Sequence, residues 1–174
     1  MDSDFILTTK KFITRQAVTS SAMRNQGKGV LKAVHAYLDQ LELFYAPPND
    51  GGKYRVWLNL QTNALLKEFP TTTKPWGAAR KALNLFMRDI FNNRYLNKVY
   101  DLDYIEKVLE IPLDSAVAKG LKKEDVKGKL PEWPGLKGLT REISDQYQKA
   151  AGALAKKRKI PTVHLDMYLW MENR

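Results

Sequence analysis

The stretch with the clearest structural signal is Trp76-Gly-Ala-Ala-Arg-Lys-Ala-Leu-Asn-Leu-Phe-Met-Arg-Asp-Ile-Phe-Asn-Asn-Arg-Tyr-Leu96. Apolar residues recur in it every three or four positions, which is the spacing of one face of an α-helix. The segment Pro70-Thr-Thr-Thr-Lys-Pro75 would break any helix that precedes it. The sequence therefore predicts an amphipathic helix over 76–96. Its apolar face would consist of Trp76, Ala79, Leu83, Phe86, Met87, Ile90 and Phe91.

Helical spacing also marks most of the chain on either side of this stretch. Upstream, a helix is expected over about 19–44, regular only from near Val30 because two glycines precede that residue. Weak strand-like alternation appears only near Phe5–Ile13. We therefore predict an all-α fold with a single compact helical domain over residues 1–174. The other expected helices cover 53–69, 102–109, 113–121, 140–159 and 162–172, and the expected loops cover 46–52 and 122–138.

The composition excludes several classes of protein. Hydrophobic residues make up 44% of the 174 residues, enough to form a core. The absence of cysteine excludes disulfides, thiolate zinc sites and cysteine-ligated iron–sulfur clusters. No apolar run reaches the roughly 18 residues that a membrane span needs, and the Met1-Asp-Ser-Asp start lacks the basic flank of a signal peptide. We expect a cytoplasmic protein with no membrane partner.

The charge of the chain points to a polyanionic partner. Lys and Arg total 29 against 19 Asp and Glu, a formal net charge of +10. Such an excess favours nucleic acid, because each neutralised phosphate releases condensed counterions. Membrane-surface binding would concentrate the basic residues in one amphipathic helix, whereas here they are spread along the chain. Two other uses of the charge remain open, namely solubility alone and an acidic protein partner.

Two segments could carry chemistry. In the first, Gly77 lies where a turn leads into a helix, and the outward backbone N–H groups of such a helix start suit a phosphate. Arg80 and Lys81 follow in the first turns. The same residues could also be no more than a helix start. In the second, Asp114 follows an apolar run and opens a short helix. It is either an N-cap or a carboxylate at the mouth of a cleft, and both can be true.

Together the segments resemble the helix-hairpin-helix DNA glycosylase superfamily, in particular its endonuclease III-like branch. The hairpin of that family reads Leu-Pro-Gly-Val-Gly-Arg-Lys-Thr-Ala-Asn, and Gly77-Ala-Ala-Arg80-Lys81-Ala-Leu-Asn84 is similar. The family's catalytic aspartate lies in Val-Asp-Thr-His-Val-x-Arg-Val, and Leu113-Asp114-Ser-Ala-Val-Ala-Lys119 is similar. Upstream, Asn25-Gln26-Gly-Lys-Gly-Val30 resembles the Gln-led helix start that enters the duplex. The resemblance implies a helix-hairpin-helix-like element.

The resemblance also implies a role for each matching residue. Lys81 falls on the family's Schiff-base lysine and Asp114 on its catalytic aspartate. Gln26, with Asn25, would fill the gap left by a flipped nucleotide. Ala79 stands where the family has its second glycine, and 33 positions separate Lys81 from Asp114, more than in the family. The remaining expected DNA contacts are Arg24, Gly77, Arg80, Asn84 and Lys119.

The remaining candidate residues give weaker evidence for a functional site. His164 and Asp166 are two positions apart, so on a helix they point in different directions. With two histidines and no cysteine we expect no metal and no cofactor. Trp133 could anchor a loop or stack on a base. The charge predicts nucleic-acid binding, and the resemblance implies a DNA glycosylase, with or without abasic-site lyase activity. We expect a monomer that binds double-stranded DNA. The alternative is a non-catalytic, basic, helical nucleic-acid-binding protein.

Overall fold

A computed structural model describes residues 3–43, 50–70, 72, 74–126 and 128–173. This part of the chain contains no β-strand, so the all-α prediction is confirmed. None of its helices has both the length and the apolar character that crossing a membrane requires. The helices are α1 (Ser3–Ala17), α2 (Val30–Gln40), α3 (Gly51–Glu68), α4 (Trp76–Asn92), α5 (Arg94–Tyr100), α6 (Ser115–Glu124), α7 (Gly135–Gly138), α8 (Arg141–Arg158) and α9 (Leu165–Asn173), with 3-10 turns η1 (Asp103–Lys107) and η2 (Thr162–His164).

The strand-like alternation at residues 5–13 is misleading, because this segment belongs to helix α1. The buried residues of α1 are Lys10, Thr14 and Ala17, which are four and three positions apart and so share one helix face. Phe5 and Phe12, which contribute to the alternation, are exposed. The positions of the buried residues show the helical period, which the alternation of polar and apolar residues along the sequence does not.

Two predicted boundaries also move. Helix α4 ends at Asn92 and not at Leu96, because the Asn93 side chain accepts hydrogen bonds from the N–H groups of Tyr95 and Leu96 and caps a new helix, α5. Regular helix α2 begins at Val30, after Gly29 with φ 84°, as expected from the glycines. The same helix ends at Gln40 and not near Phe44, with Leu41 in an extended conformation as its C-cap. Most of the predicted 46–52 loop lies outside the described residues.

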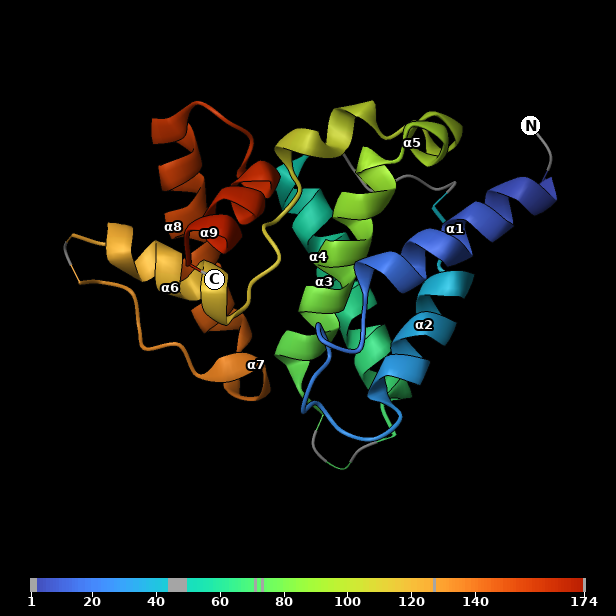
Figure 1. Cartoon of the computed structure of the whole chain (residues 1–174), viewed down its shortest axis with the longest axis horizontal. Helices are drawn as coiled ribbons and strands as arrows, with labels where there is room; N and C mark the ends of the chain where they lie inside the picture. The colour runs from blue at the N-terminus through green and yellow to red at the C-terminus, as the bar shows by residue number, and fades with distance from the viewer. Residues whose placement is uncertain (1–2, 44–49, 71, 73, 127, 174) are drawn as a thin grey trace.

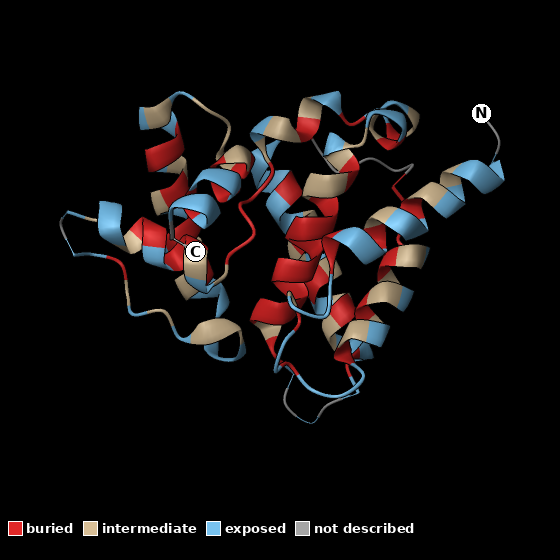
Figure 2. Cartoon of the chain, viewed as in Figure 1, coloured by how far each residue is buried: buried red, intermediate tan, exposed pale blue. Residues whose placement is uncertain are grey.

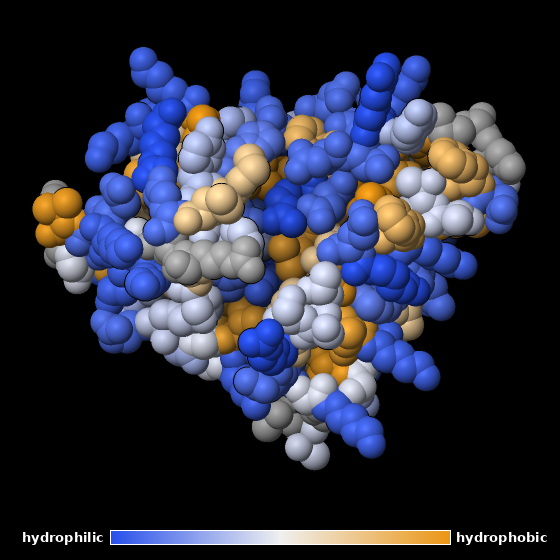
Figure 3. Space-filling model, viewed as in Figure 1, coloured by the Kyte–Doolittle hydropathy of each residue, from blue (hydrophilic) through white to orange (hydrophobic). Residues whose placement is uncertain are grey.

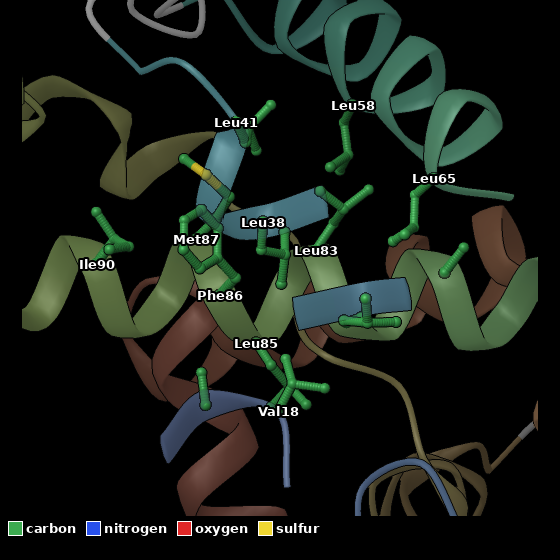
Figure 4. Packing of buried hydrophobic residues seen from close by; sticks show 14 of the residues in the cluster. Val18, Leu38, Leu41, Leu58, Leu65, Leu83, Leu85, Phe86, Met87 and Ile90 are labelled. Carbon is green, nitrogen blue, oxygen red and sulfur yellow. The ribbon is translucent and has the colours of Figure 1, made fainter. Parts of the chain in front are cut away.

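Helix α4 is the centre of the fold. Figure 4 shows Leu83 of α4 among Leu38 of α2 and Leu58 and Leu65 of α3, all of them fully buried. Every residue from Gly77 to Met87 is buried, so the polar side of the helix is covered as well as the apolar side. An amphipathic helix normally leaves its polar side to solvent. Here the second side of α4 faces the C-terminal half of the chain, which it also contacts through α7 and α8.

The buried apolar residues fall into two clusters. The first cluster draws on α1 to α5 and η1, and the second on the segment from Ile111 through α6, α8 and α9. Figure 1 shows the two groups of helices side by side, joined by the extended chain that leads into α6. Figure 2 shows that this connecting chain is itself largely buried. The boundary between the clusters is therefore a place where residues far apart in sequence meet.

Candidate active-site cleft

A cleft of about 750 Å³ opens where the two clusters meet. Its walls come from the segment after α1, from α4, from Pro112 and Asp114, and from η2 and α9. On the face shown in Figure 3, hydrophilic residues lie beside apolar ones along the boundary between the helix groups. The charged residues of the lining are Arg24, Lys81, Arg88, Asp89, Asp114 and Asp166.

Lys81 and Asp114 meet in this cleft. The Lys81 Nζ lies 3.3 Å from Asp114 Oδ2, although 33 positions separate the two residues. Helix α4 carries Lys81, whose side chain is 9% exposed, and the start of α6 carries Asp114, whose side chain is 26% exposed. The amine and the carboxylate thus form an ion pair that is mostly shielded from water but still reaches the cleft.

Asp114 also caps α6. Its Oδ1 accepts hydrogen bonds of 3.0 Å from the N–H groups of both Ala116 and Val117, and its Oδ2 points to Lys81. The N-cap interpretation is therefore confirmed, and the carboxylate lines the cleft as well. Because one oxygen is held by the backbone, the second has a fixed direction, which suits a group that accepts a proton from the lysine.

The segment before Asp114, Glu110 and Ile111, is hydrogen-bonded to helices on both sides. Gln148 of α8 accepts a hydrogen bond from the Ile111 N–H at 3.1 Å and donates one to the Ile111 carbonyl at 2.8 Å. The preceding Glu110 pairs with Arg80 of α4. These contacts hold the segment before Asp114 against both helix groups. The position of Asp114 relative to Lys81 therefore depends on how the two groups pack together.

A second group of charged residues lines the same cleft. Arg88 donates hydrogen bonds to Asp89 and to Oδ2 of Asp166, a buried residue at the start of α9. Burial raises the pKa of the Asp166 carboxyl to about 6; the Arg88 guanidinium opposes the rise, and the Asp114 carboxylate adds to it. The cleft therefore holds two carboxyl groups in different surroundings.

The predicted DNA contacts Arg80 and Asn84 have internal partners instead. The Arg80 guanidinium is buried and donates two hydrogen bonds to Glu110, at 2.9 and 3.0 Å, and others to Thr62 and Asn59. Asn84 donates to Glu110 at 3.3 Å. As a bidentate partner of a buried carboxylate, Arg80 cannot also reach a phosphate. The charge that was expected to hold DNA here stabilises the fold.

Gly77 does not present an open helix start either. A Cβ at this position would lie 2.5 Å from the Leu136 carbonyl oxygen and 2.7 Å from Leu139 Cβ. The segment around α7 thus covers the beginning of α4, which is not the open helix start that a phosphate site needs. Residues 77–84 lie in a regular helix, and the glycine is needed for close packing rather than for a turn.

The three upstream candidates are placed differently from one another. Arg24 is exposed and lines the cleft. Asn25 is exposed and has φ 64°, in the left-handed region. Gln26 is buried, with its Nε2 donating to the Arg24 carbonyl and its Oε1 without a partner. In this conformation Gln26 supports the loop that carries Arg24 and does not project into a duplex.

Lys119 lies outside the main cleft. It is exposed on α6, in a shallower hollow of about 500 Å³ that Lys122 and Trp133 also line. The Trp133 ring packs edge-on against Tyr147, with ring centroids 5.4 Å apart, and belongs to the second cluster. This contact agrees with the interpretation of Trp133 as a loop anchor.

Sequence reasoning missed Arg88 and Asp89 and set Asp166 aside. A signal for the first two was present, because Lys81, Arg88 and Asp89 are seven and eight positions apart, or two helical turns. Asp166 could not be assigned in this way, because η2 and α9 reach the cleft only through tertiary packing. His164 hydrogen-bonds Glu106 at 2.8 Å while Asp166 pairs with Arg88, so the two have different partners.

The residues described contain no group of three or more side chains arranged to hold a metal ion. Comparisons with protein-family models, with curated proteins and with solved structures find no match to this chain.

Proposed function

We propose that this protein binds DNA and excises a damaged or modified base, with Lys81 as the nucleophile and Asp114 as its proton acceptor. One observation carries the proposal, namely that an amine and a carboxylate from distant segments lie 3.3 Å apart in the wall of a cleft of about 750 Å³. That volume lies within the range of small-molecule sites, roughly 300 to 1,000 Å³. It suits a single nucleotide turned out of the duplex.

The chemistry follows from the placement of the two groups. An amine attacks a sugar C1′ only in its neutral form, so the Lys81 ammonium must lose a proton on the way to the reaction. Asp114 Oδ2 is the proton acceptor within reach. Attack on C1′ expels the base and leaves a covalent link between the lysine and the sugar. In the opened form this link is a Schiff base, from which strand cleavage can follow.

Binding to DNA is supported by charge. The formal net charge is +10, and Arg24 is an exposed cation at the cleft itself. Since several of the expected phosphate contacts are buried, the backbone of a duplex would be held by exposed basic residues such as Arg24 and Lys119. Affinity that depends on such contacts falls steeply with salt concentration.

Borohydride trapping tests the proposal. Purified protein is incubated with a duplex that contains one abasic site, with and without sodium borohydride, and covalent adducts are counted on a denaturing gel. We expect an adduct with the wild type, none with Lys81→Ala, and a strongly reduced yield with Asp114→Asn. Lys149→Ala, which removes an exposed lysine of α8 outside the cleft, is the matched control and should trap like the wild type.

A non-catalytic DNA-binding protein is the second candidate. It is favoured by the low exposure of Lys81, because a shielded ion pair can be structural. This candidate predicts salt-sensitive DNA binding with no adduct and no base release by the wild type. It also predicts that Lys81→Ala lowers stability without changing any reaction.

A further inference from the structure

We propose that Asp166 is the general acid of this cleft, protonating the base as it leaves. This inference rests on the proposed function and extends it to the class of substrate. It assigns a catalytic residue beyond the Lys81–Asp114 pair, on an element 85 positions downstream of Lys81. The substrate that needs such a group is a nucleotide whose base is neutral, because a neutral base is a poor leaving group until it is protonated.

The position of Asp166 fits this role. It is the second residue of α9 and lines the same cleft as Lys81 and Asp114. It is close enough to both for their charges to affect its own protonation. A nucleotide whose C1′ lies at Lys81 would therefore place its base within the part of the cleft that α9 borders. The neighbouring Met167 and Trp170 line this part of the cleft as well and supply apolar surface for a base.

Arg88 holds Asp166 in a defined direction. Its guanidinium donates to Asp166 Oδ2 and also to Asp89, so the arginine is fixed at two points. Arg88 engages Oδ2, and Asp166 lines the cleft, so Oδ1 is the oxygen that we expect to meet a ligand. A carboxyl group held by one oxygen with the other available is the arrangement that proton donation requires.

The two carboxyl groups of the cleft have surroundings that suit different tasks. Asp114 accepts two backbone N–H bonds and one from Lys81. Asp166 is buried, and burial favours its protonated form, with a pKa of about 6. Pairs of carboxyl groups whose surroundings separate them in this way commonly divide the roles of base and acid. The charged or titratable groups around Asp166 are Lys81, Arg88 and Asp89 from α4, Asp114 before α6, and His164 from η2.

The step balances as follows. Asp114 takes the extra proton of the Lys81 ammonium and releases it to water. The N-glycosidic bond breaks, its electron pair passes to the base, and Asp166 gives its proton to a ring nitrogen or carbonyl oxygen of the base, which leaves neutral. The Lys81 nitrogen forms the new bond to C1′ and becomes a secondary ammonium. Asp166 regains a proton from water before the next turnover.

The test compares substrates that need an acid with substrates that do not. Duplexes carrying a neutral base (hypoxanthine, uracil or 8-oxoguanine) require protonation, whereas 7-methylguanine is already cationic and a preformed abasic site has no base to lose. Single-turnover base release and borohydride trapping are measured from pH 5 to 8 for the wild type, Asp166→Asn and Asp103→Asn. Asp103→Asn is the matched control, because it makes the same change at an exposed carboxylate that does not line the cleft. Circular dichroism melting confirms that each variant is folded.

We expect Asp166→Asn to lower release of the neutral base by roughly 10²-fold or more. Release of 7-methylguanine and trapping at the abasic site should change far less. Release of the neutral base by the wild type should fall as pH rises above about 6, and this fall should be absent in Asp166→Asn and present in Asp103→Asn. If Asp166→Asn does not fold, the pH dependence of neutral-base release by the wild type tests the role of Asp166.

Other outcomes overturn the inference in distinguishable ways. Equal losses of release and of abasic trapping in Asp166→Asn would mean that Asp166 only supports Lys81. An unchanged rate and pH profile would give it no part in the reaction. A wild type that traps abasic DNA but releases no neutral base contradicts the inference and leaves the Lys81 chemistry standing. A wild type that neither traps nor releases overturns the proposed function, and the inference with it.

Discussion

Gly77 lies where the segment around α7 packs directly against α4. Because an added Cβ would lie 2.5 Å from the Leu136 backbone oxygen, Gly77→Ala must push α7 away from α4. We expect a loss of about 1 to 3 kcal/mol in the free energy of unfolding, as for other overpacked positions. Gly152→Ala on α8 is the control: nothing lies within 4 Å of its Cβ, so helix propensity should make it neutral or slightly stabilising. Urea denaturation measures both, and equal effects would contradict the packing.

Asp166 makes stability depend on pH. Its pKa is raised from an ordinary value near 3.8 to about 6, so the folded state binds the proton more tightly than the unfolded state. The contribution of Asp166 to stability is therefore greatest below pH 4 and is lost as pH rises towards 6 and above. Relative to Asp166→Asn, the wild type should lose roughly 3 kcal/mol across this window, at 1.36 kcal/mol for each pKa unit.

Urea denaturation of the wild type and of Asp166→Asn at pH 4 and pH 7 checks this expectation. Comparing the two proteins at each pH cancels the contribution of the other titrating groups. The raised pKa would be contradicted if the difference in unfolding free energy between the two proteins were the same at both pH values. It would also be contradicted if the wild type gained stability relative to Asp166→Asn at pH 7.

At the scale of the element, helix α4 takes part in a buried ion pair. Arg80 and Glu110 are both buried and paired, so Arg80→Met would leave the Glu110 carboxylate with Asn84 and the half-exposed Arg55, at 3.8 Å, as its remaining partners. Breaking such a pair costs about 3 to 5 kcal/mol, and we expect the lower end. The double variant Arg80→Met/Glu110→Gln should recover part of the loss, because the uncompensated charge is gone. Thermal or urea unfolding distinguishes the two variants, and equal stability would contradict the account of this pair.

The helices show how much of the fold could be predicted. The helix at Trp76 and the helices α6, α8 and α9 followed from apolar spacing, because one side of each packs on a core. The predicted helix 102–109 is a 3-10 turn, and α7 lies in the predicted loop 122–138. Helix α1 could not be predicted from alternation, because two of its buried residues, Lys10 and Thr14, are polar and are satisfied by carbonyl groups only in the folded state. The end of α4 depends on Asn93, whose side chain could equally have faced solvent.

The same limits apply to the site. Lys81 and Asp114 could be chosen from residue type and resemblance, and the structure brings them together. Arg80 and Asn84 lie beside Lys81 in sequence and look equally suited to a phosphate. Their burial depends on Glu110, which reaches them only through the packing of the chain after η1. No local pattern distinguishes a lysine that faces a cleft from an adjacent arginine that faces a carboxylate.

At the scale of the whole molecule, the cleft lies at the boundary between the two apolar clusters, which remain separate. If DNA lies across this boundary, exposed cations at its rim should contribute to affinity through counterion release. Arg24→Ala should then weaken binding to an undamaged duplex and reduce the slope of log affinity against log salt by about 1. Lys149→Ala, on α8 and not among the residues that line the cleft, is the control and should change binding less. Fluorescence anisotropy over a salt series measures both, and equal slopes for the two variants would place the DNA elsewhere.

The most direct test of the proposed function is to locate the covalent link itself. The adduct formed with abasic DNA is reduced with sodium borohydride, the DNA and protein are digested, and mass spectrometry identifies the modified residue. We predict a single reduced sugar remnant on Lys81, in the wild type and in the Lys149→Ala control. A remnant on another lysine, or bound DNA with no remnant at all, would contradict Lys81 as the nucleophile of this cleft.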